Sequence, residues 1–181
     1  DVLYKYAQAL EKAKRWRQAA ETMVTIEKQF EYKRSLATNI TYSYSKDGDS
    51  KNADKWAEEA YKSSYGSTSA YNLALSRMRQ GNNESYEKLM EESIELDPSN
   101  YAALLAFGNH LMDKNDTRGH EYIVSACKIL NDLLEKEDLD EDDCNRLEKV
   151  AKTLGRQDIL ENLHDYLENL GVAESVVKEE F

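Results

Sequence analysis

The side chains that could carry out chemistry are few in this sequence and are scattered along it. The histidines His110, His120 and His164 show neither the HExxH nor the HxH spacing that brings two imidazoles onto one metal ion. The sequence also contains no G-x-S-x-G segment and no glycine-rich loop that could cradle a phosphate. We therefore predict no metal site among the histidines and no nucleophilic serine.

The two cysteines, Cys127 and Cys144, are too few for a disulfide framework, which favours a reducing compartment and a cytoplasmic location. Cys127 falls on an apolar helix face, where a thiol packs as a small hydrophobic group. Cys144 follows several acids, whose charge raises the pKa of a thiol instead of activating it. Three glycosylation-like triplets, which begin at Asn39, Asn83 and Asn115, are the feature that would fit secretion.

An acidic run from Glu135 to Asp143 is the strongest candidate for a cation site. A calcium-binding EF-hand loop needs glycine at its sixth position and an acid at its twelfth. Counting from Asp138, those positions hold Asp143 and Lys149, so the spacing does not fit. We interpret the acids as capping the positive end of a helix that starts near Asp140. With no catalytic residues, no metal and no cofactor predicted, we expect a protein that is not an enzyme.

The composition also restricts the class of partner. The chain has 181 residues, one proline, seven glycines and a formal net charge of −11. An acidic surface disfavours nucleic acids and anionic lipids, since both are bound through lysine and arginine. No run of apolar residues is long enough to span a membrane.

The elements that must position any functional residue are visible in residues 70–100. Apolar and small residues recur at helical spacing before and after the turn signal Gly81-Asn82-Asn83, and Pro98 ends the second helix. Two amphipathic helices alone cannot bury both of their apolar faces. The unit therefore predicts copies of itself.

Related units precede and follow this one, and the chain resembles the tetratricopeptide repeat (TPR) family, whose repeats are helix-turn-helix units of about 34 residues. The pairs of a large and a small residue in the first helices are Tyr6-Ala7, Ile40-Thr41, Leu73-Ala74 and Phe107-Gly108. The turn residues are Lys14, Gly48, Gly81, Asn115 and Gly155. The residues that open the packing face of each second helix are Ala19, Ala53, Tyr86, His120 and Leu160, at spacings of 34, 33, 34 and 40. In this register His120 and His164 are partly buried.

The resemblance implies an all-α fold: a helical-hairpin solenoid of about five TPR-like repeats plus a C-terminal capping helix. We expect one superhelical domain over residues 1–181, with repeats at 1–33, 34–66, 67–99, 100–138 and 139–170. Gly171 is expected to end the fifth pair, and residues 172–180 to form the capping helix. Because the chain begins with Asp1 and not methionine, we expect it to be part of a longer protein.

The resemblance also implies a function, because in TPR arrays the first helices line a concave groove that takes an extended peptide or a partner's helix. We expect a non-catalytic scaffold or adaptor. The groove positions correspond to Asn39, Tyr42, Tyr71, Asn72, Leu75, Met78, Leu105, Asn109 and Met112, with Tyr4, Gln8 and Thr38 at the same surface. The family commonly uses asparagine at the places of Asn39 and Asn72 to hydrogen-bond a peptide backbone. The net charge of −11 favours a basic or neutral segment as partner.

Other interpretations stay open at this point. The same side chains could pack between neighbouring first helices, or the array could form a homodimer. The domain could also be a regulatory or targeting unit attached to an enzyme encoded elsewhere in the full-length chain. The lysine and arginine clamp of chaperone-binding TPR domains is replaced here by Thr68, Asn72, Ala102 and Ala106, which argues against that specialisation.

Overall fold

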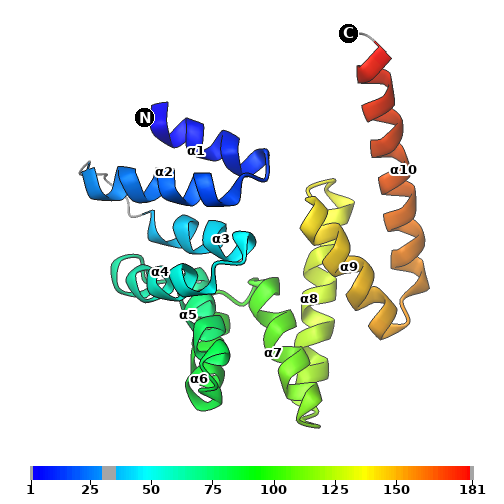
Figure 1. The fold of residues 1–181 in the computed structure, drawn as a ribbon. Helices are drawn as coiled ribbons and strands as arrows, with labels where there is room; N and C mark the ends of the chain where they lie inside the picture. Colours follow the sequence, from blue (N-terminus) through cyan, green and yellow to red (C-terminus); the bar gives the residue numbers. More distant parts are fainter. Residues whose placement is uncertain (1, 30–35, 180–181) are drawn as a thin grey trace. The chain divides into compact units, whose positions relative to one another are not determined.

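The computed structural model describes residues 2–29 and 36–179, with side chains described up to Gly171. Within this part of the chain the regular elements are all α-helices, which confirms the predicted all-α class (Figure 1). In order they are α1 (Val2–Lys12), α2 (Trp16–Gln29), α3 (Ala37–Asp47), α4 (Ser50–Ser63), α5 (Ser67–Arg79), α6 (Asn83–Leu96), α7 (Tyr101–Asp113), α8 (Arg118–Glu135), α9 (Glu141–Leu154) and α10 (Gln157–Glu179).

The chain divides into two compact units, Asp1–Asn100 and Tyr101–Phe181. The first unit contains the pairs α1–α2, α3–α4 and α5–α6, and the second contains α7–α8 and α9–α10. In the first unit α2 also packs on α3, and α4 packs on α5. Within the first unit each pair therefore packs on its neighbour in sequence, as repeats in a solenoid do. That all five pairs act as one superhelical domain stays a prediction.

The hairpin turns recur with one geometry at the predicted positions. The backbone angle φ is positive at all five turn residues, between 56° and 82°. These residues are Lys14, Gly48, Gly81, Asn115 and Gly155. Glycine adopts this left-handed conformation without a steric penalty, and asparagine tolerates it. A lysine does so at a cost, so at position 14 the sequence and the backbone geometry conflict, as they do at Glu137 (φ 55°) between α8 and α9.

Each unit has its own apolar core. In the first unit, Met23, Ile26 and Ile40 are almost completely buried at the contact between α2 and α3. In the second unit, Cys127 is buried with the aliphatic side chains of α8, α9 and α10, as predicted for an inert thiol. Burial raises the pKa of both Cys127 and Cys144, and the nearby acids add to the effect at Cys144.

The packing register predicted for the fourth and fifth repeats is wrong by one residue. His120 and His164 are exposed, whereas Gly119, Ile123 and Ile159 are buried. The residues that open the packing faces are therefore Ala19, Ala53, Tyr86, Gly119 and Ile159, at spacings of 34, 33, 33 and 40. A Cβ added to Gly119 would lie 2.5 Å from the carbonyl oxygen of Gly108, so α7 and α8 meet through backbone at this point. Because glycine has no apolar side chain, the hydrophobic pattern placed the start of the packing face at the neighbouring residue, His120.

Two further expectations concern helix ends. The Asp140 side chain accepts a hydrogen bond from the Asp143 backbone N–H (2.8 Å) and caps α9, which confirms the capping interpretation of the acidic run. Gly171 does not end the last pair, because α10 continues through it to Glu179. Residues 172–179 are thus a continuation of α10 and not a separate capping helix. A single glycine inside a helix costs about 1 kcal/mol relative to alanine, which is not enough to stop it.

Candidate peptide-binding surface

The first helices of the second and third repeats, α3 and α5, contact each other and carry six of the predicted groove residues. We call these residues the α3–α5 surface: Asn39, Tyr42, Tyr71, Asn72, Leu75 and Met78. The start of α5 is held locally, because the Ser69 hydroxyl accepts from the Gly66 N–H (3.0 Å) and donates to the Gly66 carbonyl (2.9 Å). The start of α3 is tied to the preceding repeat by the Leu36 N–H, which donates to Glu27 (3.0 Å).

A cavity of about 690 Å³ opens where α3 and α5 begin. Its lining residues come from α1, α3, the α4–α5 junction and the end of α6: Tyr4, Leu36, Thr38, Asn39, Ser64, Gly66, Ser67, Thr68, Ser69, Leu96 and Asp97. We call it the hydroxyl-lined cavity because six of these eleven residues carry a hydroxyl group. Of the α3–α5 surface, Asn39 belongs to this lining, whereas Tyr42, Tyr71, Asn72, Leu75 and Met78 do not.

The polar groups of the cavity differ in whether they are already engaged. The Ser67 hydroxyl donates to the Ser93 carbonyl (2.8 Å), so it is used within the fold. Thr38, Asn39 and Thr68 make no side-chain hydrogen bond to any described residue. An amide and two hydroxyls are therefore available at the wall of this cavity to donate to or accept from a ligand.

Tyr42 is held from two sides although 43% of it is exposed. Its ring meets Trp16 of α2 edge to face, with centroids 5.7 Å apart. The Lys46 ammonium lies 5.7 Å from the Tyr42 ring and 5.8 Å from the Trp16 ring. Trp16, at the start of α2 in the first repeat, thus packs on the next repeat and fixes the orientation of Tyr42.

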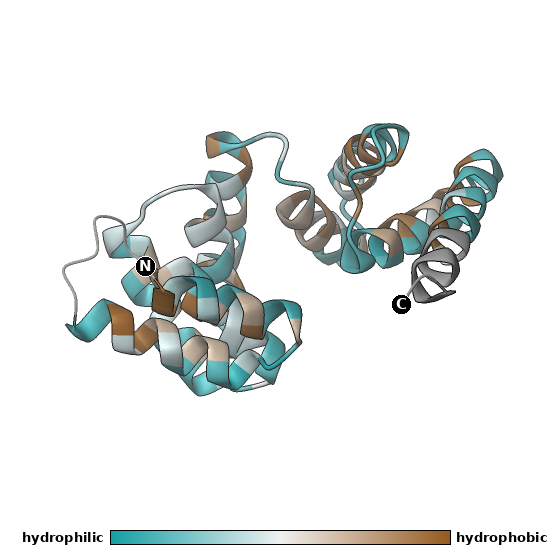
Figure 2. Ribbon diagram, turned by 90° about the horizontal axis from the view of Figure 1, so that it is seen from above, coloured by the Kyte–Doolittle hydropathy of each residue, from teal (hydrophilic) through white to brown (hydrophobic). Residues whose placement is uncertain are grey.

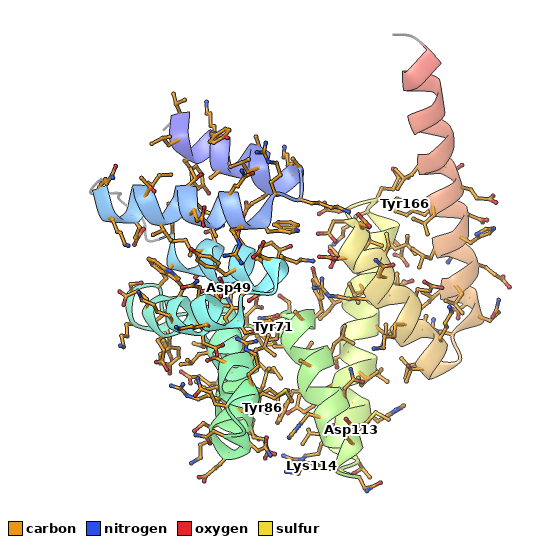
Figure 3. The ribbon with its side chains drawn as sticks, in the orientation of Figure 1. Asp49, Tyr71, Tyr86, Asp113, Lys114 and Tyr166 are labelled. Atoms are coloured by element: carbon orange, nitrogen blue, oxygen red, sulfur yellow. The ribbon has the colours of Figure 1, made fainter. Side chains whose placement is uncertain are left out.

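Along α5, Tyr71, Asn72 and Leu75 are half-buried, and Met78 is 40% exposed. Figure 3 labels Tyr71 of α5 and the completely buried Tyr86 of α6. Burial raises the pKa of Tyr86 to about 12, and the neighbouring Tyr71 and Glu87 contribute. Tyr71 therefore influences a buried group of its own repeat, while part of its side chain stays exposed.

The remaining predicted residues lie on α7 in the second unit. Leu105 is half-buried and packs against the core of that unit. Asn109 is exposed, and Met112 is 42% exposed with its side chain next to Gly119. These three residues follow one another by about one helical turn and so share a face of α7.

Leu96 and Asp97 were not predicted as part of the cavity, and Thr68 was considered only as a position of the chaperone-binding clamp. Leu96 and Asp97 come immediately before Pro98, and the pattern read this segment only as the end of a helix. The turn after each second helix connects it to the first helix of the next repeat. Residues in this turn therefore lie near the starts of first helices. Among the described lining residues, Asp97 carries the one charged side chain.

The described residues contain no group of three or more histidine, cysteine or acidic side chains that could hold a metal ion. Among the described helices, none combines the length and the apolar character that crossing a membrane requires.

Comparison with solved structures identifies the fold. The chain matches the C-terminal part of a TPR repeat-containing protein from Cytophaga hutchinsonii at a TM-score of 0.57 and 13% identity, over 82% of this chain and 64% of that one. It matches MamA at a TM-score of 0.57 and 10% identity, over 93% and 96% of the two chains. The chain has the tetratricopeptide-repeat fold.

A third match to this TPR fold is YrrB, described as a TPR protein with an unusual peptide-binding site. The TM-score is 0.52 and the identity 13%, over 97% of this chain and 90% of YrrB. No protein-family model and no curated protein sequence matches the chain. The similarity therefore lies in the TPR architecture alone.

Proposed function

We propose that this chain is a non-catalytic protein-interaction module that binds an extended, basic or neutral peptide segment on the α3–α5 surface. The observation that carries the proposal is the position of Asn39, which lies exposed at the hydroxyl-lined cavity with its amide making no hydrogen bond to the described residues. An amide offers one acceptor oxygen and two donor hydrogens, so it can hydrogen-bond a peptide group whatever side chain the bound residue carries.

Asn72 supports the same role on the next repeat. It is half-buried on α5, 33 residues after Asn39, and its side chain makes no hydrogen bond to the described residues. Two amides at equivalent places on adjacent helices suit a ligand that runs across both helices. An extended peptide repeats its backbone groups at regular intervals and meets this requirement.

Specificity would come from the side chains around the asparagines. Tyr42 is a rigid aromatic group, because Trp16 and Lys46 hold its ring. Leu75 and the exposed Met78 add apolar surface on α5. Aromatic residues and methionine are enriched where proteins contact one another. Asp97 at the cavity and the net charge of −11 disfavour an acidic segment.

The proposal can be tested by selecting peptides from a random display library on the whole chain. We expect bound sequences poor in aspartate and glutamate. Affinity is then measured for the wild type and for the double variant Asn39→Ala/Asn72→Ala. Each lost hydrogen bond should weaken binding by about 0.5–1.5 kcal/mol, and the melting temperature should not change because neither amide bonds within the described fold.

The control is Asn145→Ala, since Asn145 is exposed on α9 in the other unit and also makes no hydrogen bond to the described residues. It should leave the affinity unchanged. Undiminished affinity in the double variant would show that the peptide is held elsewhere.

A further inference from the structure

The hydroxyl-lined cavity is flanked by uncharged stretches of sequence. Residues 36–45 at the start of α3 and residues 63–76, which join α4 to α5 and form most of α5, contain no charged side chain, although 33% of the whole chain is charged. The segment between α4 and α5 is accordingly pale in Figure 2, between the two ends of the hydropathy scale. Among the described lining residues, the carboxylate of Asp97 therefore sets the charge of an otherwise neutral wall.

This carboxylate is held through one oxygen, and its other oxygen faces no partner among the described residues. Asp97 is half-buried, and its Oδ1 accepts from the Ser99 backbone N–H (2.9 Å) and from the Ser99 hydroxyl (2.6 Å). Its Oδ2 makes no hydrogen bond or ion pair with any described residue. A fixed carboxylate of this kind can accept from a cation without first giving up another partner.

The fold also fixes Asp97 at the cavity, because the end of α6 is tied to the start of α5. The hydroxyl of Ser67 donates to the Ser93 carbonyl (2.8 Å), and the hydroxyl of Ser93 donates to the Ser67 carbonyl (2.8 Å). The side-chain amide of Asn100 donates to the Ser67 hydroxyl (2.8 Å). Since Ser93 and Asn100 lie on either side of Asp97 in the sequence, these bonds hold the segment between them against α5.

The amino-terminal ends of α3 and α5 oppose a cation at this cavity, because each end of this kind carries about half a positive elementary charge. At α3 the Leu36 N–H donates to the Glu27 carboxylate (3.0 Å), whose full negative charge offsets that end. At α5 the Gly66 N–H donates to the Ser69 hydroxyl (3.0 Å), which is neutral. The full charge of Asp97 thus exceeds the partial charge that remains at α5, and the balance favours a cation.

We propose that the hydroxyl-lined cavity binds an arginine side chain of the peptide, with the guanidinium paired to Oδ2 of Asp97. A guanidinium has five N–H donors in one plane and needs several acceptors, whereas the ammonium of lysine has three. The wall supplies the hydroxyls of Thr38 and Thr68 and the amide oxygen of Asn39. None of these three side chains makes a hydrogen bond to a described residue.

The size and the apolar part of the cavity fit the same side chain. Its volume of about 690 Å³ lies within the range of about 300–1,000 Å³ that is usual for ligand pockets. Leu36 and the 44% exposed Leu96 line it and offer apolar surface to the methylene groups of arginine. The inference rests on the proposed function, because it names the side chain that a peptide held by Asn39 places in the cavity.

The test uses arginine itself as the probe, so that it needs no selected peptide. N-acetyl-arginine amide is titrated into the whole chain, and the backbone amides are followed by NMR. We expect saturable shifts at Thr38, Asn39 and Thr68, with a dissociation constant on the order of 1 mM for a ligand of this size. The citrulline analogue has the same shape without the charge and should bind about tenfold more weakly. The lysine analogue should also bind more weakly, since it has fewer donors.

Asp97→Asn removes the charge and keeps an oxygen that can accept from Ser99, so the melting temperature should not change. The variant should bind the arginine amide about tenfold more weakly than the wild type does, and no better than it binds the citrulline amide. The matched control is Glu95→Gln, which removes the same charge from an exposed position on α6 that does not line the cavity. It should leave the affinity unchanged.

Peptides selected on the whole chain give a second readout. They should share an arginine, and its replacement by citrulline should weaken binding to the wild type by about tenfold. The same replacement should have little effect on binding to Asp97→Asn, because the two changes remove the same interaction.

Four results would overturn the inference: the arginine amide causes no saturable shifts, the citrulline or lysine amide binds equally well, Asp97→Asn binds as the wild type does, or Glu95→Gln weakens binding as much as Asp97→Asn. The last result would assign the effect to the overall acidity of the chain. Failure of the proposed function gives a different pattern, in which Asn39→Ala/Asn72→Ala keeps its affinity for selected peptides while the wild type still prefers arginine over citrulline.

Discussion

Replacing Gly119 by alanine is the most direct test of how the fourth helix pair is packed. A Cβ at this position would lie 2.5 Å from the Gly108 carbonyl oxygen and 2.8 Å from the Met112 backbone nitrogen. Both obstacles are backbone atoms of α7, so no side-chain rotation can relieve the clash. Since ordinary contacts of a Cβ begin at 3.4 Å, the two helices would have to separate by almost an ångström.

The size of the effect follows from two opposing contributions. Overpacking a closely packed interior costs about 1–3 kcal/mol. Replacing glycine by alanine inside a helix returns at most about 1 kcal/mol, and less here because Gly119 lies in the first turn of α8. We therefore expect Gly119→Ala to lower the free energy of unfolding by about 1–2 kcal/mol. Urea unfolding followed by circular dichroism measures this difference.

Gly171→Ala is the matched control, because it makes the same substitution in a helix where nothing lies within 4 Å of the new Cβ. It should leave stability unchanged or raise it by up to about 1 kcal/mol. Gly108→Ala should fall between the two variants, because two of its three closest contacts are side-chain atoms of Ile123. If Gly119→Ala unfolds at the same urea concentration as the wild type, the close approach of α7 and α8 is wrong.

Three further predictions concern other positions in the chain. Lys14→Gly should raise the free energy of unfolding by about 0.5–1 kcal/mol, because the left-handed backbone at this turn strains any residue with a Cβ; a lower urea midpoint would contradict it. Ala74→Leu should destabilise by about 1–3 kcal/mol, since Ala74 is fully buried, whereas the exposed Lys88→Leu should change stability by less than about 0.5 kcal/mol; equal effects would mean that the register of the third repeat is wrong. The hydroxyl of Tyr101 donates to Asp143 (3.0 Å), and burial followed by this carboxylate raises its pKa to about 12. The protonated Tyr101 hydroxyl therefore contributes fully to folding stability below the ordinary tyrosine pKa of about 10, and this contribution is lost as the pH rises towards 12. The melting temperature of Tyr101→Phe should consequently fall less over this interval than that of the wild type.

Much of the architecture could be predicted because it depends on local features. The helix pairs follow from apolar spacing, and the turns follow from residues that tolerate a positive φ. Gly48, Gly81 and Gly155 marked their turns in the sequence, and the backbone adopts the left-handed conformation at each of them. The capping role of Asp140 is local in the same sense, since it reaches an N–H only three residues away.

The candidate site was predicted less completely, because its parts come from different repeats. The repeat spacing placed Asn39 and Asn72 on equivalent positions, and the contact between α3 and α5 brings their helices together. The cavity beside Asn39, in contrast, is built with Thr68 and Asp97, which come from another helix start and another helix end. A periodic pattern within one segment gives no information about residues that other segments bring close to it.

The sequence by itself determined the all-α class, the helix pairs and the turn positions, because each depends on interactions within a few residues. Only the tertiary structure decided the register of α8 and the course of α10. At Gly119 the lack of a side chain permits the close approach to Gly108. For the same reason Gly119 does not appear in the hydrophobic pattern of the sequence. At Gly171 the helix continues because glycine weakens a helix without preventing it.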